Sequence, residues 1–212
     1  CFEDAGDNIS EKNANYCELT AIYALHKNVE DEFYGIEHYR RFFCDKYGKP
    51  ISEMECKKII NEGKIILPIP CKLKPNIFLD YAMHHKIKDL ECVRDIIMND
   101  YNDYFNTFDA VMHSQELCCY NMIVCDSKIF NSYCSWLFEL FEKLEKQVDL
   151  SSYSKYQARL YGFLSERLLN VWIKKNVEKE RCVYRDVHMI NNCTKENGMK
   201  SYLRTVKANL FI

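Results

Sequence analysis

The sequence is poor in glycine and proline, with 6 and 4 among its 212 residues, which argues against a linker-rich or disordered chain. It has no apolar window long enough for a transmembrane helix and no visible signal peptide. It also lacks excess positive charge: 29 basic and 31 acidic side chains give a formal net charge of −2. Nonspecific nucleic-acid binding needs dense positive charge, so we expect no nucleic-acid partner.

Cysteine is abundant, with 12 residues, yet no Cys-x-x-Cys pair occurs. The cysteines are scattered through apolar contexts, which is typical of reduced, buried thiols in a cytosolic protein. A metal site built from Cys118, Cys119, Cys125 and Cys134 is an alternative with less support.

The pattern of apolar residues predicts short strands alternating with longer helices. With 48% hydrophobic residues, the chain can bury a substantial core. We therefore predict an α/β protein, with a Rossmann-like sheet covered by helices on both faces and a helix-rich C-terminal half. The predicted helices are 10–28 with Ser10 as N-cap, 52–61 with a Ser52/Glu55 capping box and Gly63 as its stop, 76–113 with breaks, 127–146 capped at Asp126-Ser127, and 156–176. The predicted strands are 33–38, 64–68, 117–125 and 181–187.

The most informative segment is a predicted strand that ends in His38-Tyr39-Arg40-Arg41. In open α/β folds, ligands bind in the crevice outside the carboxyl ends of strands. Guanidinium groups match phosphate oxygens two at a time, so this strand end suits a diphosphate. The alternative is a strand end with solvated arginines paired to nearby acids.

Two further segments place polar groups near predicted helix ends. The loop with Asp7 and Asn8 opens a helix, where backbone amides could meet an anion and these side chains a sugar or base; a plain helix cap is the alternative. His84 and His85 stand in the helical region ahead of Asp89. Adjacent helical histidines point to different sides, so surface placement is the alternative there.

Two more segments place polar residues inside apolar patterns. Asn121 interrupts the predicted strand 117–125, which suggests a hydrogen bond to a ligand hydroxyl or a satisfied core amide. Glu166 and Arg159 lie in an otherwise apolar helix. A partly buried carboxylate is costly unless it is paired or used, so Glu166 is either a general base or one half of a salt bridge with arginine.

Taken together, these segments resemble a glycosyltransferase-like family of bacterial capsular and exopolysaccharide gene clusters, described as a domain of unknown function. The resemblance covers about residues 7–176. The matching motifs, in chain order, are NISEKN (8–13), CELT (17–20), GIEHYRR (35–41), ILP (66–68), HHKIKDL (84–90), YNM (120–122), WLF (136–138), and Arg159 with GFLSERL (162–168).

The resemblance implies a GT-A-type, nucleotide-sugar-transferase-like fold in a single domain, 1–212, with 177–212 as a C-terminal extension. It implies transfer of a hexose, galactofuranose or galactose, from a UDP-sugar to a lipid-linked glycan in capsular, exopolysaccharide or O-antigen synthesis. Such an enzyme would be cytoplasmic, in peripheral contact with the inner face of the plasma membrane. The alternative is a noncatalytic glycan-binding or scaffold subunit of the same pathway.

Two departures from the family pattern matter for activity. The family begins with one more strand, which holds part of the nucleotide pocket, whereas this chain starts at Cys1 without methionine. We therefore expect an N-terminally truncated chain, for which an inactive state is one alternative. The Asp-x-Asp metal motif is not evident, so dependence on Mg²⁺ or Mn²⁺ stays open.

The resemblance and the residues together assign roles. The catalytic candidates are Glu166 as base and Asp89 as second choice. The donor-binding candidates are Asp7, Asn8, Lys12, His38, Tyr39, Arg40, Arg41 and Asn121, and the acceptor- or phosphate-binding candidates are His84, His85 and Arg159.

Overall fold

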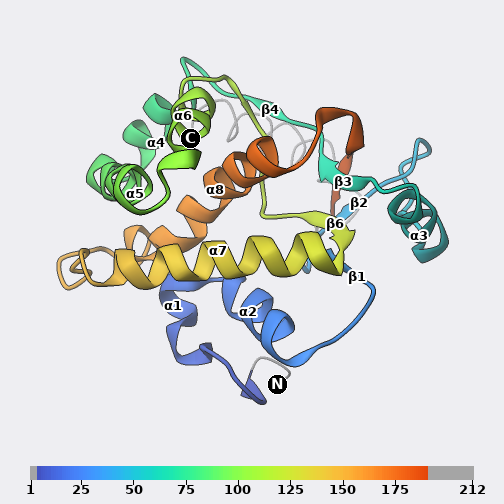
Figure 1. Cartoon of the computed structure of the whole chain (residues 1–212), viewed down its shortest axis with the longest axis horizontal. Helices are drawn as coiled ribbons and strands as arrows, with labels where there is room; N and C mark the ends of the chain where they lie inside the picture. Colours follow the sequence, from blue (N-terminus) through green and yellow to red (C-terminus); the bar gives the residue numbers. More distant parts are fainter. Residues whose placement is uncertain (1–3, 191–212) are drawn as a thin grey trace, which may run out of the picture.

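The computed structural model describes residues 4–190, and within them a four-stranded mixed sheet lies at one end of a group of helices (Figure 1). The strand order is β1 (Phe33–Ile36), β6 (Ile123–Asp126), β3 (Ile65–Pro68), β7 (Cys182–Arg185). β6 runs antiparallel to both of its neighbours, and β7 runs parallel to β3. The carboxyl ends of β1, β3 and β7 therefore meet the start of β6 at one edge of the sheet. The predicted α/β class is confirmed.

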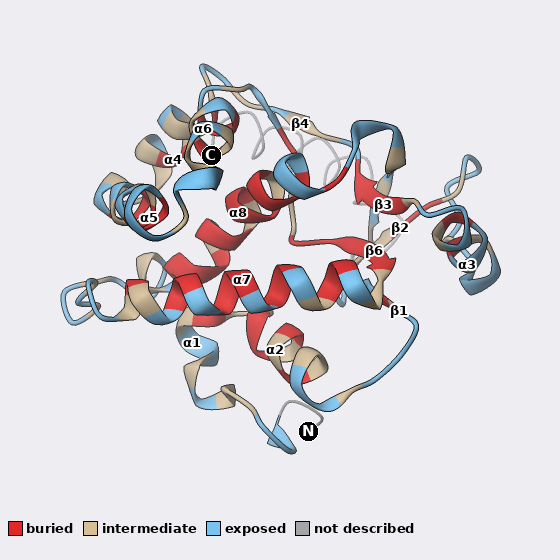
Figure 2. Ribbon diagram, viewed as in Figure 1, coloured by how far each residue is buried: buried red, intermediate tan, exposed pale blue. Residues whose placement is uncertain are grey.

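Helices cover both faces of this sheet, as predicted. In β3, Ile65 and Leu67 join the larger core with helices α7 (Ser127–Glu145) and α8 (Leu160–Asn176), while Ile66 joins a second core with α3 (Glu53–Asn61). Successive side chains of a strand point to opposite faces, so a strand buried on both faces reads as a continuous apolar run. Figure 2 shows the burial concentrated in the sheet and along α8. Each fully buried isoleucine contributes roughly 1.5–3 kcal/mol.

The caps predicted for the helices that begin near residues 52 and 127 are confirmed. Ser52 Oγ accepts the Glu55 backbone N–H at 3.2 Å and begins α3, and Gly63 follows that helix with a φ of 73°. Asp126 Oδ1 accepts the Ile129 N–H at 2.8 Å and begins α7. These caps satisfy backbone donors that a helix leaves unpaired at its start.

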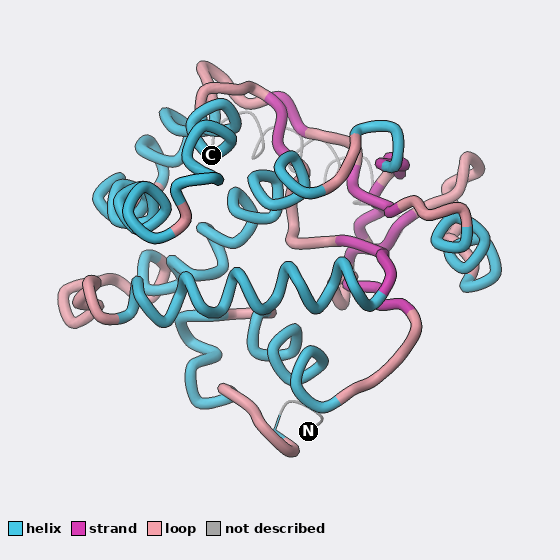
Figure 3. The backbone as a smooth tube through the Cα atoms, in the orientation of Figure 1, coloured by secondary structure: helices cyan, strands magenta, loops and turns pink. Residues whose placement is uncertain are grey.

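The remaining elements surround α7 and α8 (Figure 3). No helix within residues 4–190 is long and apolar enough to cross a membrane. Two small sheets pair β2 (Arg41–Phe43) with β8 (Val187–Met189) and β4 (Cys71–Lys72) with β5 (Glu116–Leu117). The other helices and 3₁₀ turns are η2 (Ser10–Lys12), α1 (Asn13–Tyr16), α2 (Leu19–Asn28), α4 (Ile77–His84), α5 (Ile87–Asp100), α6 (Asn102–Met112), η3 (Gln157–Arg159) and η4 (Lys179–Arg181).

The single helix predicted over 10–28 is wrong. The chain breaks at Cys17, whose φ of 55° lies in the left-handed region, and α2 starts after it. α8 packs on this break: a Cβ added to Gly162 would lie 3.3 Å from Cys17 Sγ. Ser10 is not the N-cap either, because Asn8 Oδ1 accepts both the Ser10 N–H and its hydroxyl.

The strand predicted over 117–125 is also wrong. β5 and β6 are separate, and the residues between them turn, so Asn121 lies in a turn and not inside a strand. The predicted strand 33–38 ends at Ile36, and the predicted strand 181–187 divides at Asp186 into β7 and β8. In the region expected as a C-terminal extension, residues 182–189 pair with β3 and β2, and residues 191–212 lie outside the described part.

Candidate active site

Polar side chains from four separate segments meet where β1 ends and β6 begins. We call this group the edge cluster, and its members are Glu18, His38, Arg41, Tyr120, Asn121 and Glu166. Because β1 and β6 are antiparallel, with Ile36 opposite Ile123, the residues after β1 lie beside those before β6. This is the end of the sheet at which the sequence analysis expected a ligand to bind.

The turn before β6 is built from two residues in a left-handed conformation. Tyr120 and Asn121 have φ values of 75° and 51°, which non-glycine residues adopt rarely. The Tyr120 N–H donates to Glu166 Oε1 at 3.1 Å and so ties the turn to α8. Strained backbone of this kind clusters at functional sites when the surroundings hold it in place.

Asn121 is buried, with 2% of its surface exposed. Its side-chain amide donates to Glu18 Oε1 at 2.7 Å and to Ser165 Oγ at 2.8 Å, so it joins the turn to the start of α2 and to α8. Its Oδ1 has no hydrogen-bond partner among the described residues. Asn121 therefore holds Glu18 in place at the edge, and its own side chain lies below the surface.

The turn after β1 positions His38. His38 and Arg41 exchange both backbone hydrogen bonds at 3.1 Å, with Tyr39 and Arg40 at the tip. His38 Nε2 lies 2.6 Å from the Tyr120 carbonyl and 3.9 Å from Glu18 Oε1. A carbonyl oxygen only accepts, so Nε2 carries a proton. In the neutral ring Nδ1 is then the acceptor.

The two adjacent arginines have different environments. The Arg41 guanidinium lies 4.4 Å from the centroid of the Tyr120 ring, and its buried Nε has no hydrogen-bond partner among residues 4–190. Arg40 is exposed and lies over the ring of Tyr39, which is 84% exposed. Arg41 thus belongs to the edge cluster, whereas Arg40 and Tyr39 sit at the tip of the turn.

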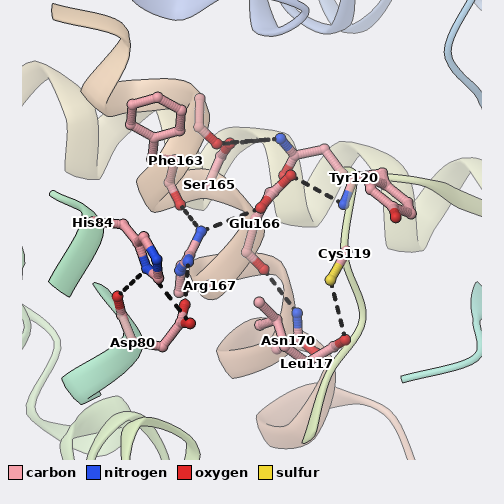
Figure 4. Close-up of polar contacts among 12 residues, drawn as sticks. Asp80, His84, Leu117, Cys119, Tyr120, Phe163, Ser165, Glu166, Arg167 and Asn170 are labelled. Atoms are coloured by element: carbon pink, nitrogen blue, oxygen red, sulfur yellow. Dashed lines mark hydrogen bonds and ion pairs between the residues drawn. The ribbon is translucent and has the colours of Figure 1, made fainter. Parts of the chain in front are cut away.

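Glu166 links the edge cluster to a buried ion-pair network (Figure 4). Its Oε2 lies 3.2 Å from Arg167 Nη1, and Arg167 Nη2 lies 3.3 Å from Asp80. Burial raises the pKa of the Glu166 carboxyl, and Glu18 adds to this; Arg167, the Tyr120 amide and His38 oppose the rise. A carboxyl with a raised pKa beside an arginine and a histidine is a candidate for moving a proton.

His84 and His85 lie beside this network. His84 Nδ1 contacts the Asp80 backbone carbonyl at 2.8 Å. The His85 ring stacks on Phe163 at 4.0 Å, and burial lowers the pKa of His85 to about 4, so this ring is neutral at pH 7. Asp89 is buried and accepts the Tyr153 hydroxyl at 2.6 Å, and burial raises its pKa.

The N-terminal candidates have partners of their own. Lys12 pairs with Glu145 at 2.8 Å, at the C-terminal end of α7. Asp7 Oδ1 accepts the Tyr23 hydroxyl at 3.3 Å, and Asn8 makes the turn before η2. The structure gives these three residues no hydrogen bond or ion pair with the edge cluster.

Arg159 stands between the edge cluster and the aromatic residues near His85. Its Nε donates to Cys17 Sγ at 3.2 Å, and its guanidinium lies 5.6 Å from the Phe163 ring. Hydrogen bonding to Cys17 raises the pKa of Arg159, and Glu18 contributes to the rise. Arg159 therefore adjoins Glu18 from the side of α8.

Glu18, like Tyr120, is a member of the edge cluster that the sequence analysis did not name as a site candidate. It lies within the CELT segment, but periodicity places it as an ordinary residue of a longer helix. The backbone reversal at Cys17 puts it next to Asn121, 103 positions away in sequence. A cysteine in a left-handed conformation carries no sequence signal, so this contact could be found only from the tertiary structure.

The described residues do not offer a metal site. No group of three or more His, Cys, Asp or Glu side chains within 4–190 is arranged to hold an ion, and this covers the four cysteines considered above. The ten cysteines of this range are all unpaired.

A family model described as Domain of unknown function (DUF4422) matches residues 2–177. The chain belongs to this family. The fold is also similar to a solved structure of the WbbM bifunctional glycosyltransferase in its apo form, with a TM-score of 0.77 and 27% identity. The match covers 90% of this chain and 39% of that protein, so the chain spans less than half of WbbM's length. No curated protein matches the chain significantly.

Proposed function

We propose that the protein is a glycosyltransferase of GT-A type that moves a hexose, galactose or galactofuranose, from a UDP-sugar to a glycan acceptor. Support comes from the similarity to part of a bifunctional glycosyltransferase and from the edge cluster. The observation that carries the proposal is that the Arg41 guanidinium lies 4.4 Å from the centroid of the Tyr120 ring, while the Tyr120 N–H donates to Glu166. A guanidinium and a partly buried carboxylate thus lie at one sheet edge.

The proposed reaction is a displacement at the anomeric carbon. The acceptor hydroxyl forms the new glycosidic bond, and the bond from the sugar to the diphosphate breaks with its electron pair leaving on UDP. Arg41 and His38 stabilise the negative charge that develops on the diphosphate. Glu166 takes the proton of the acceptor hydroxyl, because its raised pKa brings it nearer to the working pH.

The remaining edge residues act by positioning. Asn121 and Glu18 fix the turn on which Tyr120 and His38 depend, and Arg159 lies on the acceptor side. We place the acceptor among lipid-linked glycans of capsular, exopolysaccharide or O-antigen synthesis, with peripheral membrane contact in the cytoplasm. This placement follows the resemblance of the motifs.

The adjacent arginines give a matched test. We expect Arg41→Ala to lose UDP-galactose binding by isothermal titration and transfer or donor hydrolysis by mass spectrometry, with an unchanged unfolding midpoint. We expect Arg40→Ala, at the exposed tip, to change binding by less than about fivefold, since an exposed charge is worth less than about 1 kcal/mol. Full donor binding and turnover in Arg41→Ala would refute the assignment. Donor binding without hydrolysis or transfer would favour the noncatalytic alternative.

A further inference from the structure

The first three turns of α8 are buried except along one stripe. The residues of that stripe are Phe163, Glu166 and Asn170, which are three and four positions apart and so lie on one helix face. The segment before β6 covers its C-terminal part: Asn170 bonds to both the N–H and the carbonyl of Cys118, and Glu166 accepts the Tyr120 N–H. The end at Phe163 is not bonded to that segment.

Aromatic rings gather at this end. The Phe163 ring stacks on His85 at 4.0 Å, and the Tyr156 ring lies 5.9 Å from His85 with an interplanar angle of 20° and 5.1 Å from Phe163. Tyr156 is 48% exposed. Tyr156, Phe163 and His85 form what we call the aromatic platform, and about half of its outermost ring faces solvent.

Polar groups border the platform on the side of the edge cluster. Arg159 lies over Phe163 and is held by Cys17, next to Glu18. Glu166 is one turn along α8 from Phe163. The platform therefore has a guanidinium over one of its rings and the Glu166 carboxylate one helical turn away, so hydrogen-bonding groups lie near an apolar aromatic face.

This combination matches the chemistry of a sugar. A hexopyranose has an apolar face of C–H groups and a rim of hydroxyls, so it can lie flat on an aromatic ring while its rim bonds to charged side chains. We propose that the aromatic platform is the subsite for the acceptor sugar, with the hexose ring on Tyr156 and its hydroxyls toward Arg159 and Glu166. The proposal rests on the proposed function and adds to it where the acceptor binds.

The test measures binding of methyl β-D-galactopyranoside by saturation-transfer NMR in the presence of UDP. The variants are Tyr156→Ala and Tyr156→Phe, and the matched control is Tyr47→Ala. Tyr47 is 74% exposed and lies in the turn after β2, far from Tyr156 in the sequence. An aromatic stacking contact is worth about 0.5–1.5 kcal/mol, so we expect Tyr156→Ala to weaken binding up to about tenfold. Tyr156→Phe keeps the ring and should bind normally, as should Tyr47→Ala.

Three results would overturn the subsite: no saturation transfer in the unmodified protein, equal binding in Tyr156→Ala, or equal loss in Tyr47→Ala. Titration of UDP-galactose into the same variants separates the acceptor sugar from the donor sugar. Unchanged donor affinity in Tyr156→Ala supports the acceptor assignment, and a parallel loss of donor affinity contradicts it. Arg41→Ala could keep its affinity for UDP-galactose while Tyr156→Ala binds the galactoside more weakly. That result would refute the donor site of the proposed function and still support the acceptor-sugar subsite.

Discussion

The side-chain amide of Asn121 donates to the carboxylate of Glu18 at 2.7 Å and connects the turn before β6 to the start of α2. This bond brings two segments 103 residues apart to the same sheet edge. His38 also reaches both Glu18 and the Tyr120 carbonyl, so the Asn121 amide and the His38 ring both link Glu18 to this turn.

Replacing Asn121 with Asp should destabilise the protein. The new carboxylate would lie next to Glu18 in a buried position and would leave Ser165 without its donor. We expect the free energy of unfolding at pH 7 to fall by about 2–4 kcal/mol, measured by urea denaturation. Glu18→Gln removes the repulsion, so the double variant should recover part of the loss, and strict additivity of the two changes would contradict this account.

Replacing Glu166 with Gln tests its assignment as base. Gln keeps an acceptor for the Tyr120 N–H, so donor binding should persist while transfer is lost. In the unmodified protein, kcat/KM should rise with pH through an apparent pKa above the ordinary value for Glu, because burial raises the pKa of Glu166 and the ionised form accepts the proton. Transfer by Glu166→Gln at the unmodified rate would rule out this role.

The same carboxyl has a predictable effect on stability. Its pKa is raised in the folded state, so the folded protein holds this proton more tightly than the unfolded chain does. The resulting stability is present below the ordinary Glu pKa and is lost as pH rises through the folded value. Glu166→Gln removes that dependence, so unfolding curves of the two proteins should diverge as pH rises, with the unmodified protein losing stability relative to the variant.

Lys12 offers a contrasting case. Its ammonium pairs with Glu145, and both side chains are about one-third exposed. We expect Lys12→Met to lower the free energy of unfolding by less than about 1 kcal/mol and to leave UDP-galactose affinity unchanged in titration. A loss of donor affinity comparable with that of Arg41→Ala would extend the donor site to the N-terminal segment.

The sequence by itself determined the elements whose signals are local. The Ser52 and Asp126 caps, Gly63 after α3 and the apolar run of β3 each depend on neighbouring residues, and the structure confirms all of them. The alternation of strands and helices was enough to predict a sheet covered on both faces.

Only the tertiary structure decided which polar residues share a site. The left-handed turns at Cys17 and Tyr120-Asn121 have no glycine to reveal them, because packing against α8 and hydrogen bonds from distant residues hold the backbone there. Those turns bring Glu18 to Asn121 and Glu166 to Tyr120. These charged residues lie in separate segments of the sequence, and only the packing of the folded chain brings them into contact.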